Sequence, residues 1–191
     1  MAIYANSIPA QERQPLGVIE ERVEKKKERL FISLVGDEVT FMSLLWPLHN
    51  LDFVLLDYLA VKERCRNKGT GSEFLRRIPE LPGVGGKTVV LEVEHPDYGD
   101  DRENKRRRVA FYRANGAKEL KGLVYMLPPL SGNLPVEMLL MMLSGSLGES
   151  IQGCLVKKVI VQIYEELYSR GSDDPLLNSF IGKIPHTVAL H

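Results

Sequence analysis

The chain has 191 residues, a length that suits one ordinary domain with a real hydrophobic core. Basic and acidic residues number 25 each, so the formal net charge is zero and gives no general attraction to nucleic acid or to an anionic membrane. Charged residues make up 26% of the chain and hydrophobic residues 44%, which is normal for a globular protein and argues against disorder.

The sequence shows no signal for export, membrane insertion or metal binding. Residues 1–9 lack the basic and then apolar pattern of a secretion signal. The most apolar stretch, 134–143, is shorter than the about 20 residues that span a bilayer, and it carries Glu137. The cysteines lie far apart and the histidines have no metal spacing, which predicts reduced thiols and no metal site. We therefore expect a cytoplasmic protein without a membrane or nucleic-acid partner.

Apolar periodicity and turn residues predict a mixture of helices and strands. A charged, helix-prone segment comes first, and two strands joined by a turn at Gly36-Asp37 follow it. A long apolar run that contains Asp57 then predicts a strand buried on both faces. Pro79 ends the next helix, and Gly116 caps a later one. The expected helices are 10–29, 69–78, 104–115 and 149–169, and the expected strands are 30–35, 38–45, 51–61, 88–94, 118–130 and 135–143.

The order of these elements indicates the fold class. The strand, helix and strand between residues 51 and 94 predict a parallel pair with a right-handed crossover, placed within a mixed sheet. The class is therefore α/β in the broad sense, or α+β. We expect one domain over residues 1–170 and a C-terminal tail over 171–191, because the tail is rich in Gly, Ser, Asp and Pro.

The segment from Leu59 to Ser72 is the main candidate for a binding site. It joins a buried strand to a helix, and glycines at 69 and 71 let the backbone approach a ligand closely. The first amides of a helix have no partner within the helix and lie at the positive end of its dipole, which suits a phosphate or pyrophosphate. Arg66 and Lys68 add positive charge beside the glycines. A plain tight turn is the alternative explanation of the same residues.

Three blocks of sequence follow the order and spacing of one known family. Arg66-x-x-Gly69-x-Gly71, preceded by Leu-Ala-Val, resembles the Gln/Arg-x-x-Gly-x-Gly/Ala loop of the GCN5-related N-acetyltransferases, the GNAT family. Leu91-Glu92-Val93 is similar to a later strand of that family, and residues 110–117 resemble its tyrosine-bearing helix. The resemblance covers about residues 31–117, and the two strands that follow fit the family's last hairpin.

The resemblance implies a mixed, mostly antiparallel sheet with a splayed parallel pair of strands, helices on both faces and an extra C-terminal helix. It also implies acetyl-CoA as co-substrate for acetyl transfer to a primary amine. The pantetheine would lie between the splayed strands, and the pyrophosphate would lie on main-chain amides of the bend. The implied cofactor-binding residues are Leu59, Val61, Arg66, Asn67, Lys68, Gly69, Thr70, Gly71 and Ser72.

The chain departs from the family pattern at three points. Asn67 stands where the family often has glycine, and asparagine tolerates the left-handed backbone that the loop needs. Lys105 falls near the position of an asparagine that usually contacts the cofactor arm. The usual opening strand has no counterpart, so either that edge strand is dispensable or the start is truncated.

Acetyl transfer needs a deprotonated amine and a proton for the departing thiolate. Tyr112 matches the family tyrosine that acts as general acid, and a tyrosine packed on the sheet is the structural alternative. Glu92 matches the glutamate assigned as base in bacterial ribosomal-protein N-terminal acetyltransferases. Asp57 matches an acid of polyamine acetyltransferases thought to act through water. Glu92 is preferred, because Glu94 shares its strand face and two close carboxylates can raise one pKa toward neutrality.

Both carboxylates also have an explanation without catalysis. Glu92 could belong to an exposed acidic strand face, and Asp57, which lies in an apolar run, has to be satisfied by some partner in any case.

Two other segments suggest functions that their surroundings do not support. Gly85-Gly86-Lys87-Thr88 is similar to part of a nucleotide-phosphate loop, but Leu81 occupies the place of its first glycine and the segment leads into a strand. The basic run 105–108 follows four acids between residues 97 and 103, which favours a solvated helix face over a nucleic-acid site. A contact with the CoA ribose phosphate or with an acidic substrate is the alternative.

The sequence leaves the acceptor and the assembly open. The acceptor would be a small-molecule amine or a protein or peptide amine, selected by the loops around 46–51 and 122–135, with the C-terminal helix as a further candidate. A homodimer is a possible assembly. The rival function is a CoA-binding sensor or scaffold that keeps the fold without catalysis, and turnover across a panel of amines would separate the two.

Overall fold

The computed structural model describes residues 2–8, 13–130 and 134–191. These residues form two compact units, and each is described by itself. Among the described residues, unit 1 holds 2–8, 13–47, 56–87 and 130, and unit 2 holds 48–55, 88–129 and 134–191.

The strands confirm the predicted class. A seven-stranded mixed sheet has the order β1-β2-β3-β4-β7-β5, with β6 also paired to β7, and the short strands β8 and β9 pair separately. The pair β3–β4 is parallel, whereas β1–β2, β4–β7, β5–β7, β6–β7 and β8–β9 are antiparallel. The strands are β1 (Arg29–Val35), β2 (Glu38–Pro47), β3 (Phe53–Val61), β4 (Thr88–Glu94), β5 (Lys118–Glu119), β6 (Tyr125–Leu127), β7 (Val136–Leu143), β8 (Ser150–Gln152) and β9 (Thr187–Ala189).

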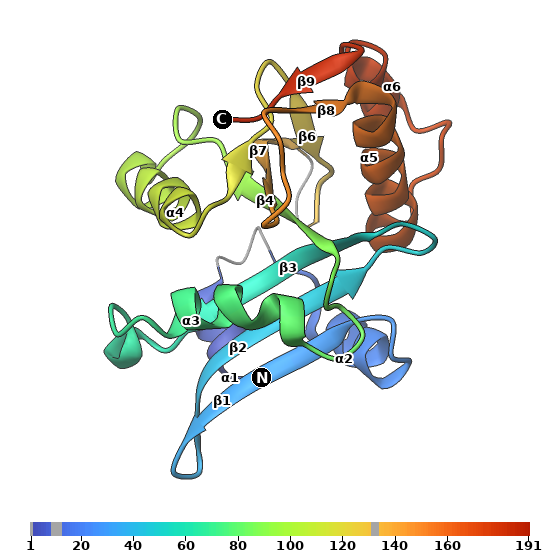
Figure 1. Ribbon diagram of the computed structural model, residues 1–191. Coiled ribbons are helices and arrows are strands. Elements are labelled where there is room, and N and C mark those ends of the chain that lie inside the picture. Colours follow the sequence, from blue (N-terminus) through green and yellow to red (C-terminus); the bar gives the residue numbers. More distant parts are fainter. Residues whose placement is uncertain (1, 9–12, 131–133) are drawn as a thin grey trace. The chain divides into compact units, whose positions relative to one another are not determined.

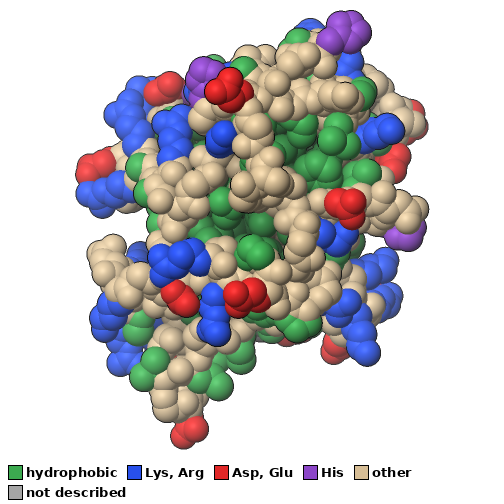
Figure 2. Space-filling view, viewed as in Figure 1, with side chains coloured by type: hydrophobic (Ala, Val, Ile, Leu, Met, Phe, Trp, Pro, Cys, Tyr) green, Lys and Arg blue, Asp and Glu red, His purple; other side chains and the backbone are tan. Residues whose placement is uncertain are grey.

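Six α-helices and two short 3₁₀ turns accompany these strands in the described chain (Figure 1). None of the described helices combines the length and the apolar character that crossing a bilayer requires. On the face seen in Figure 2, acidic and basic side chains are interspersed, in keeping with the zero net charge. The helices are α1 (Ala2–Ser7), α2 (Leu16–Glu24), α3 (Thr70–Arg77), α4 (Arg102–Ala114), α5 (Gly153–Tyr168) and α6 (Pro175–Ile181), and the 3₁₀ turns are Glu63–Cys65 and Ile78–Glu80.

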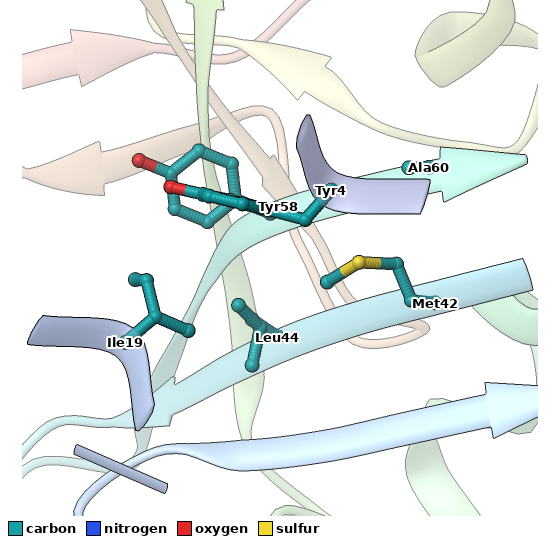
Figure 3. Close-up of a cluster of buried hydrophobic side chains, with 6 residues drawn as sticks. All are labelled: Tyr4, Ile19, Met42, Leu44, Tyr58 and Ala60. Carbon is teal, nitrogen blue, oxygen red and sulfur yellow. The ribbon is translucent and has the colours of Figure 1, made fainter. Parts of the chain in front are cut away.

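In unit 1, the two N-terminal helices cover one face of β2 and β3 (Figure 3). Strand side chains alternate between faces, so Met42 and Leu44 of β2 and Tyr58 and Ala60 of β3, each pair two residues apart, point into this cluster. The Tyr4 and Tyr58 rings meet edge to face, with their centroids 4.9 Å apart. The cluster consists of Tyr4, Ile19, Met42, Leu44, Tyr58 and Ala60.

Helix α3 covers the opposite face of the unit 1 strands. The ring of Phe74 on α3 lies 4.9 Å from that of Phe41 on β2 and 5.8 Å from that of Phe31 on β1, centroid to centroid. Helices therefore lie on both faces of these strands, as predicted. This packing holds β3 in place, and the end of β3 leads into the candidate loop.

Unit 2 is built on the antiparallel ladder between β4 and β7, which runs from Val89 opposite Leu143 to Glu94 opposite Met138. Helix α5 contributes the predicted apolar stripe, including the buried Val159, Ile163 and Leu167. The stripe thus packs into the core of unit 2, which is the structural role expected of an amphipathic helix.

Residues 171–191, expected as a tail, contain α6 and β9. Phe180 of α6 packs against the rings of Tyr125 and Tyr164, and β9 pairs with β8. Gly153 has no room for a side chain, because a Cβ atom there would lie 1.8 Å from the Pro185 carbonyl oxygen. The segment was expected to be a tail because its composition is polar. Its few apolar residues are the ones that pack against the rest of unit 2.

Most predicted elements are confirmed, and three differ for local reasons. The first helix was expected over 10–29; residues 10–12 lie outside the described residues, and the described part forms α2, which begins only after Pro15 and ends at Glu24. The strand expected over 118–130 is two short strands, separated by a turn in which Gly122 has φ of 69°. The helix expected from residue 149 begins only at Gly153, because β8 precedes it.

Candidate functional site

Strand β3 presents two kinds of side chain as it approaches the candidate loop. Tyr58 and Ala60 are buried against the N-terminal helices, whereas Leu59 and Val61, at the alternate positions, are only half-buried. Arg66 Nε donates to the Val61 carbonyl at 3.2 Å. The positions predicted to pair with pantetheine therefore lie at the end of β3, and Arg66 ties that end to the bend that follows.

The bend between β3 and α3 has a left-handed backbone at two positions. Asn67 has φ of 60° and Gly69 has φ of 80°, so Asn67 does adopt the geometry expected of it. Gly69 directly precedes α3, and its carbonyl accepts the hydrogen bond of the Glu73 amide at 2.8 Å. No side chain caps this helix end. The left-handed residues thus let α3 begin directly after the glycine.

The amides of residues 69–72 have no acceptor within the part of the chain that the structure describes. Such N–H groups at the start of a helix suit an anion. Lys62 and Arg64 both pair with Glu38, so the positive charge left beside the bend is that of Arg66 and Lys68. The bend in unit 1 thus combines amides at the start of a helix with two basic side chains, and its role as a diphosphate site stays a prediction.

Asp57 belongs to a cluster of buried ionisable groups in unit 1. Its Oδ2 lies 3.7 Å from Nη1 of Arg22, whose guanidinium lies 5.2 Å from the centroid of the Trp46 ring. Glu28, which is only 1% exposed, neighbours Asp57, and its carboxylate oxygens have no hydrogen-bond donor among the described residues. The two acids can therefore hydrogen bond to each other only if one of them is protonated.

The environment of this cluster favours protonated acids. Burial raises the pKa of Asp57 well above its ordinary value, and Glu28 raises it further, while Arg22 lowers it. Burial likewise raises the pKa of Glu28. Since two acids share one guanidinium, the cluster retains a proton over a range in which exposed carboxyls are ionised.

Glu92 of β4 is held by two phenols in unit 2. The hydroxyl of Tyr125 on β6 donates to one carboxylate oxygen, and that of Tyr168 on α5 donates to the other at 2.6 Å. Tyr125 is fully buried, and burial followed by the charge of Glu92 raises its pKa well above the usual range. Glu94 forms ion pairs with Lys105 and Arg108. Hydroxyl donors hold both oxygens of Glu92.

Tyr112 lies toward the C-terminal end of α4 and is buried. Burial raises the pKa of its hydroxyl to about 12, and Arg108, one turn earlier, opposes that shift. A phenol with this pKa keeps its proton at neutral pH. Tyr112 is therefore available as a donor of a proton or of a hydrogen bond.

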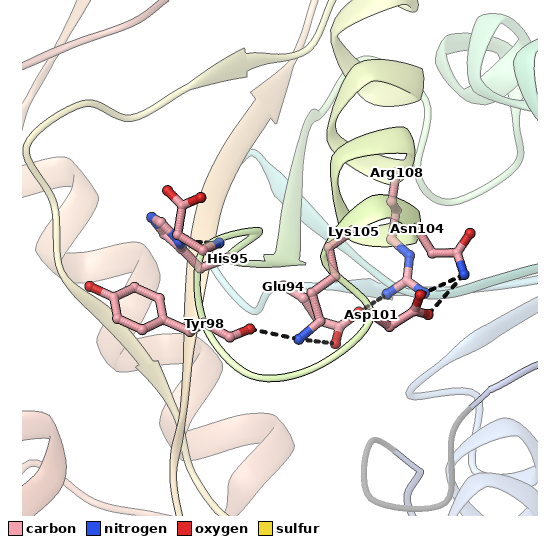
Figure 4. A network of polar contacts seen from close by, with 8 residues as sticks. Glu94, His95, Tyr98, Asp101, Asn104, Lys105 and Arg108 are labelled. Atoms are coloured by element: carbon pink, nitrogen blue, oxygen red, sulfur yellow. Dashed lines mark hydrogen bonds and ion pairs between the residues drawn. The ribbon is translucent and has the colours of Figure 1, made fainter.

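A polar network joins the start of α4 to the end of β4 in unit 2 (Figure 4). Glu94 accepts a hydrogen bond from Arg108 and lies 3.3 Å from Nζ of Lys105. The same Lys105 ammonium donates to the Tyr98 carbonyl at 3.0 Å. The basic run expected as a solvated helix face thus supplies two side chains that hold α4, the helix that carries Tyr112.

A cavity of about 330 Å³ lies in unit 1 beside α1 and the start of α2. The Tyr4 hydroxyl donates to the Gln14 carbonyl at 3.0 Å, and the Gln14 amide donates to the Tyr58 hydroxyl at 3.2 Å, which fixes one wall. Arg13 is the charged residue among the described residues of the lining. The lining residues are Tyr4, Ala5, Arg13, Gln14, Pro15, Leu16 and Leu130.

Solved structures share this architecture, although no family model and no curated protein matches the sequence. A Bacteroides thetaiotaomicron protein described as an acetyltransferase from the GNAT family matches with a TM-score of 0.71 at 22% identity, over 87% of this chain and 88% of that chain. The chain has the GNAT fold. A Bacillus subtilis acetyltransferase in complex with CoA matches with a TM-score of 0.51 at 16% identity, over 75% of this chain and 89% of that chain.

The residues predicted from the sequence occupy both units of this GNAT fold. Asp57, the end of β3 and the bend up to Ser72 belong to unit 1, while Glu92 and Tyr112 belong to unit 2. The bend follows a strand of the parallel pair and opens a helix, which is the setting that the sequence resemblance implied. The catalytic and cofactor-binding roles of these residues stay predictions.

Sequence reasoning missed the partners of both acids in the GNAT fold. Arg22 and Glu28 meet Asp57 across a large gap in sequence, and Tyr168 meets Glu92 across 76 residues. No motif contains these residues, and Glu28 comes directly after the expected lysine-rich part of the first helix. The only signal in the sequence was an acidic residue within an apolar run. Such a residue requires a partner, but the sequence does not indicate which residue that partner is.

Proposed function

We propose that this chain is an N-acetyltransferase that moves the acetyl group of acetyl-CoA directly to a primary amine. The bend before α3 carries the proposal: Asn67 and Gly69 are left-handed, and the amides of 69–72 have no acceptor in the described chain. Such a bend suits the pyrophosphate of CoA. The GNAT fold, and the CoA in the Bacillus subtilis structure of that fold, support the same function.

The residues present fit the coenzyme, whose thioester would supply the activated acetyl group. The amides of 69–72 would hold the pyrophosphate, and Arg66 and Lys68 would add charge beside it. Main-chain groups near Leu59 and Val61 would pair with the pantetheine. Because these contacts come largely from the main chain, a large side chain in place of a buried glycine should weaken CoA binding more than a substitution of the neighbouring side chains.

Transfer forms a C–N bond and breaks the C–S bond of the thioester, so the amine loses a proton and the thiolate gains one. We propose Tyr112 as the group that protonates sulfur, since its pKa of about 12 keeps it protonated at neutral pH. Tyr112→Phe should then lower kcat about 100-fold and leave the CoA Kd unchanged. A stopped-flow or steady-state assay with unaltered turnover would remove Tyr112 from the mechanism.

Glu92 is the proposed base for the amine, and Asp57, directly or through water, is the alternative. The phenols of Tyr125 and Tyr168 fix the orientation of the Glu92 carboxylate, which is the group that would accept the proton of the amine. Burial raises the pKa of Asp57, which strengthens it as a base, but Asp57 shares its surroundings with Glu28. Separate amide variants of the two acids distinguish them.

The acceptor is proposed to be a small-molecule or peptide amine that uses the cavity beside α1. The walls are largely apolar, which favours an amine with an apolar body, and Arg13 favours an acceptor that also carries a carboxylate. An acceptor screen with matched amines, with and without a carboxylate, tests this part of the proposal. No preference within any matched pair would contradict it.

Calorimetric titration with CoA tests the central observation. Gly71 is buried, so Gly71→Leu should push the bend out of place and abolish CoA binding. Gly17→Leu is the matched control in unit 1, because no atom lies within 4 Å of a Cβ placed there, and it should bind CoA normally. Circular dichroism melts confirm that both variants fold. Wild-type protein without measurable CoA affinity would sink the acetyltransferase proposal.

A CoA-binding module without turnover is the second candidate, and one feature favours it. Both oxygens of Glu92 accept phenol hydrogen bonds and Asp57 is buried beside Glu28, so neither carboxylate stands alone in front of solvent. Acetyl transfer to any amine in a broad panel, detected as a mass increase of the acceptor, would exclude the module. Tight CoA binding with no transfer and no hydrolysis would establish it.

A further inference from the structure

Strand β1 leaves one edge of the sheet open. It pairs with β2 along its whole length and stands at the end of the strand order, so no other described strand pairs with its second edge. The register shift between Ser33 and Leu34 skips Thr40 on β2, and β1 itself is continuous. An open edge presents unpaired N–H and C=O groups to another strand, and proteins usually protect it with charge, proline or a covering segment.

Between Leu30 and Val35 the open strand carries no charged residue and no proline, and no described strand pairs with its outer edge. Leu30, Ile32 and Leu34, which we name the β1 stripe, alternate along the strand and are 38%, 51% and 56% exposed. Leu30 and Ile32 pair with Leu44 and Met42 of β2, residues that belong to the cluster under α1 and α2. The helical cover therefore ends at β2. Figure 2 shows hydrophobic side chains on the surface near the tip of the β1–β2 hairpin.

We propose that β1 pairs antiparallel with β1 of a second copy of this chain, which gives a two-fold dimer with one sheet running through both copies. With Ile32 opposite Ile32 of the second copy, Leu30 of each copy faces Leu34 of the other. Cross-strand apolar pairs of this kind stabilise a sheet, and the pairing gives the open main-chain groups their partners. A two-fold contact of one patch with itself is the commonest arrangement of soluble homo-oligomers.

The charges at the two ends of β1 favour a second copy as the occupant. Lys27 lies two residues before β1 and Asp37 two residues after it, in the turns that flank the strand, so the two-fold pairing about Ile32 places the turn with Lys27 of each copy near the turn with Asp37 of the other. Both residues are exposed, and neither forms an ion pair within the described chain. Charges at the rim of an interface select register more than they add affinity, so these two ends specify the antiparallel pairing.

Sedimentation velocity over a range of protein concentrations tests the dimer. Wild-type chain should shift from the mass of one chain to that of two as its concentration rises. Ile32→Lys places two like charges opposite each other and should weaken the dimer by more than about tenfold. Leu134→Lys is the matched control, because Leu134 is 80% exposed and lies outside β1, and it should dimerise like wild type.

A charge exchange tests the register. Lys27→Glu and Asp37→Lys should each weaken the dimer, and the double variant should restore it, since it only reverses both pairs. Wild-type protein that keeps the mass of one chain at its highest soluble concentration would overturn the proposal. A dimer that survives Ile32→Lys unchanged would also overturn it. Both results are independent of CoA binding. They therefore test the dimer and not the proposed acetyltransferase function.

Discussion

The two acids that match catalytic positions lie in opposite kinds of surroundings. Asp57 meets a second buried acid, and the two share the single guanidinium of Arg22. Glu92 meets two hydroxyl donors, one on each oxygen. Burial and the neighbouring acid raise the pKa of Asp57, whereas the Glu92 carboxylate accepts two phenol hydrogen bonds. The comparison shows that a core strand can accommodate a carboxylate in two ways. Only in the Asp57 cluster does the stability of the protein depend strongly on the protonation of a neighbouring acid.

The largest expected effect comes from removing the cation of the Asp57 cluster. Arg22→Met would leave two buried acids without a positive charge, and breaking a buried ion group by removing one partner costs about 3–5 kcal/mol. The loss also includes the contact of the guanidinium with the Trp46 ring. Urea unfolding at pH 7.5 measures the difference from wild type.

Lys25→Met provides the control for that variant. Lys25 pairs with Glu21 on the same helix, but both side chains are about 60% exposed, so water screens the pair and its removal should have no measurable effect. The Arg22→Met loss should shrink at pH 5, where the two acids hold protons more readily. Equal losses for the two variants would show that the Asp57 cluster is not an electrostatically stressed group.

An effect of intermediate size is expected at Glu92, the second acid of the comparison. Glu92→Gln replaces one acceptor oxygen by an amide N–H₂ group, so one buried phenol loses its acceptor, which costs about 1–3 kcal/mol. If Glu92 is also the base, kcat should fall about 100-fold or more in the same variant. Thermal melts and an acetyl-transfer assay report the two effects separately.

Tyr168→Phe separates structure from chemistry at Glu92. It removes one donor and keeps the carboxylate, so it should cost less stability than Glu92→Gln and retain most of the activity. A Glu92→Gln protein that is destabilised but fully active would make Glu92 a structural residue and would move the role of base to Asp57.

Local patterns were sufficient to predict most of the fold. The β1–β2 hairpin, β4 and the helix before Gly116 depend on turn residues and periodicity, which a single sequence displays. The C-terminal segment was predicted less well, because β8 and β9 are short strands that form only by pairing with each other across the sequence. Gly153 shows the same dependence, since its lack of a side chain matters only because the Pro185 carbonyl lies against it.

The candidate site divides in the same way. The bend at Asn67 and Gly69 could be predicted because its chemistry belongs to consecutive residues and to the start of one helix. The surroundings of the acids could not, because Glu28, Tyr125 and Tyr168 reach them from separate elements. The sequence suggested Glu94 as the neighbour that would perturb Glu92, yet Glu94 is neutralised by Lys105 and Arg108 of α4.

The smallest expected effect is a gain in stability. The pKa values of Glu28 and Asp57 are raised above 4.5 and 3.8, their ordinary values, so the folded chain binds more protons than the unfolded chain as soon as the pH exceeds those values. The free energy of unfolding contributed by the pair is therefore complete at low pH and is lost as the pH rises through the folded pKa values. Glu28→Gln removes one of the two charges, and its amide can donate to Asp57, so it should stabilise the protein by about 1 kcal/mol at pH 8.

Urea unfolding of wild type and Glu28→Gln from pH 5 to pH 8 measures both the gain and its direction. The gain should grow with pH, because wild type loses stability over that range and the variant loses less. Glu20→Gln, at an exposed position of α2, is the matched control and should follow wild type at every pH. A Glu28→Gln protein with the wild-type pH slope would show that Glu28 and Asp57 do not share a proton.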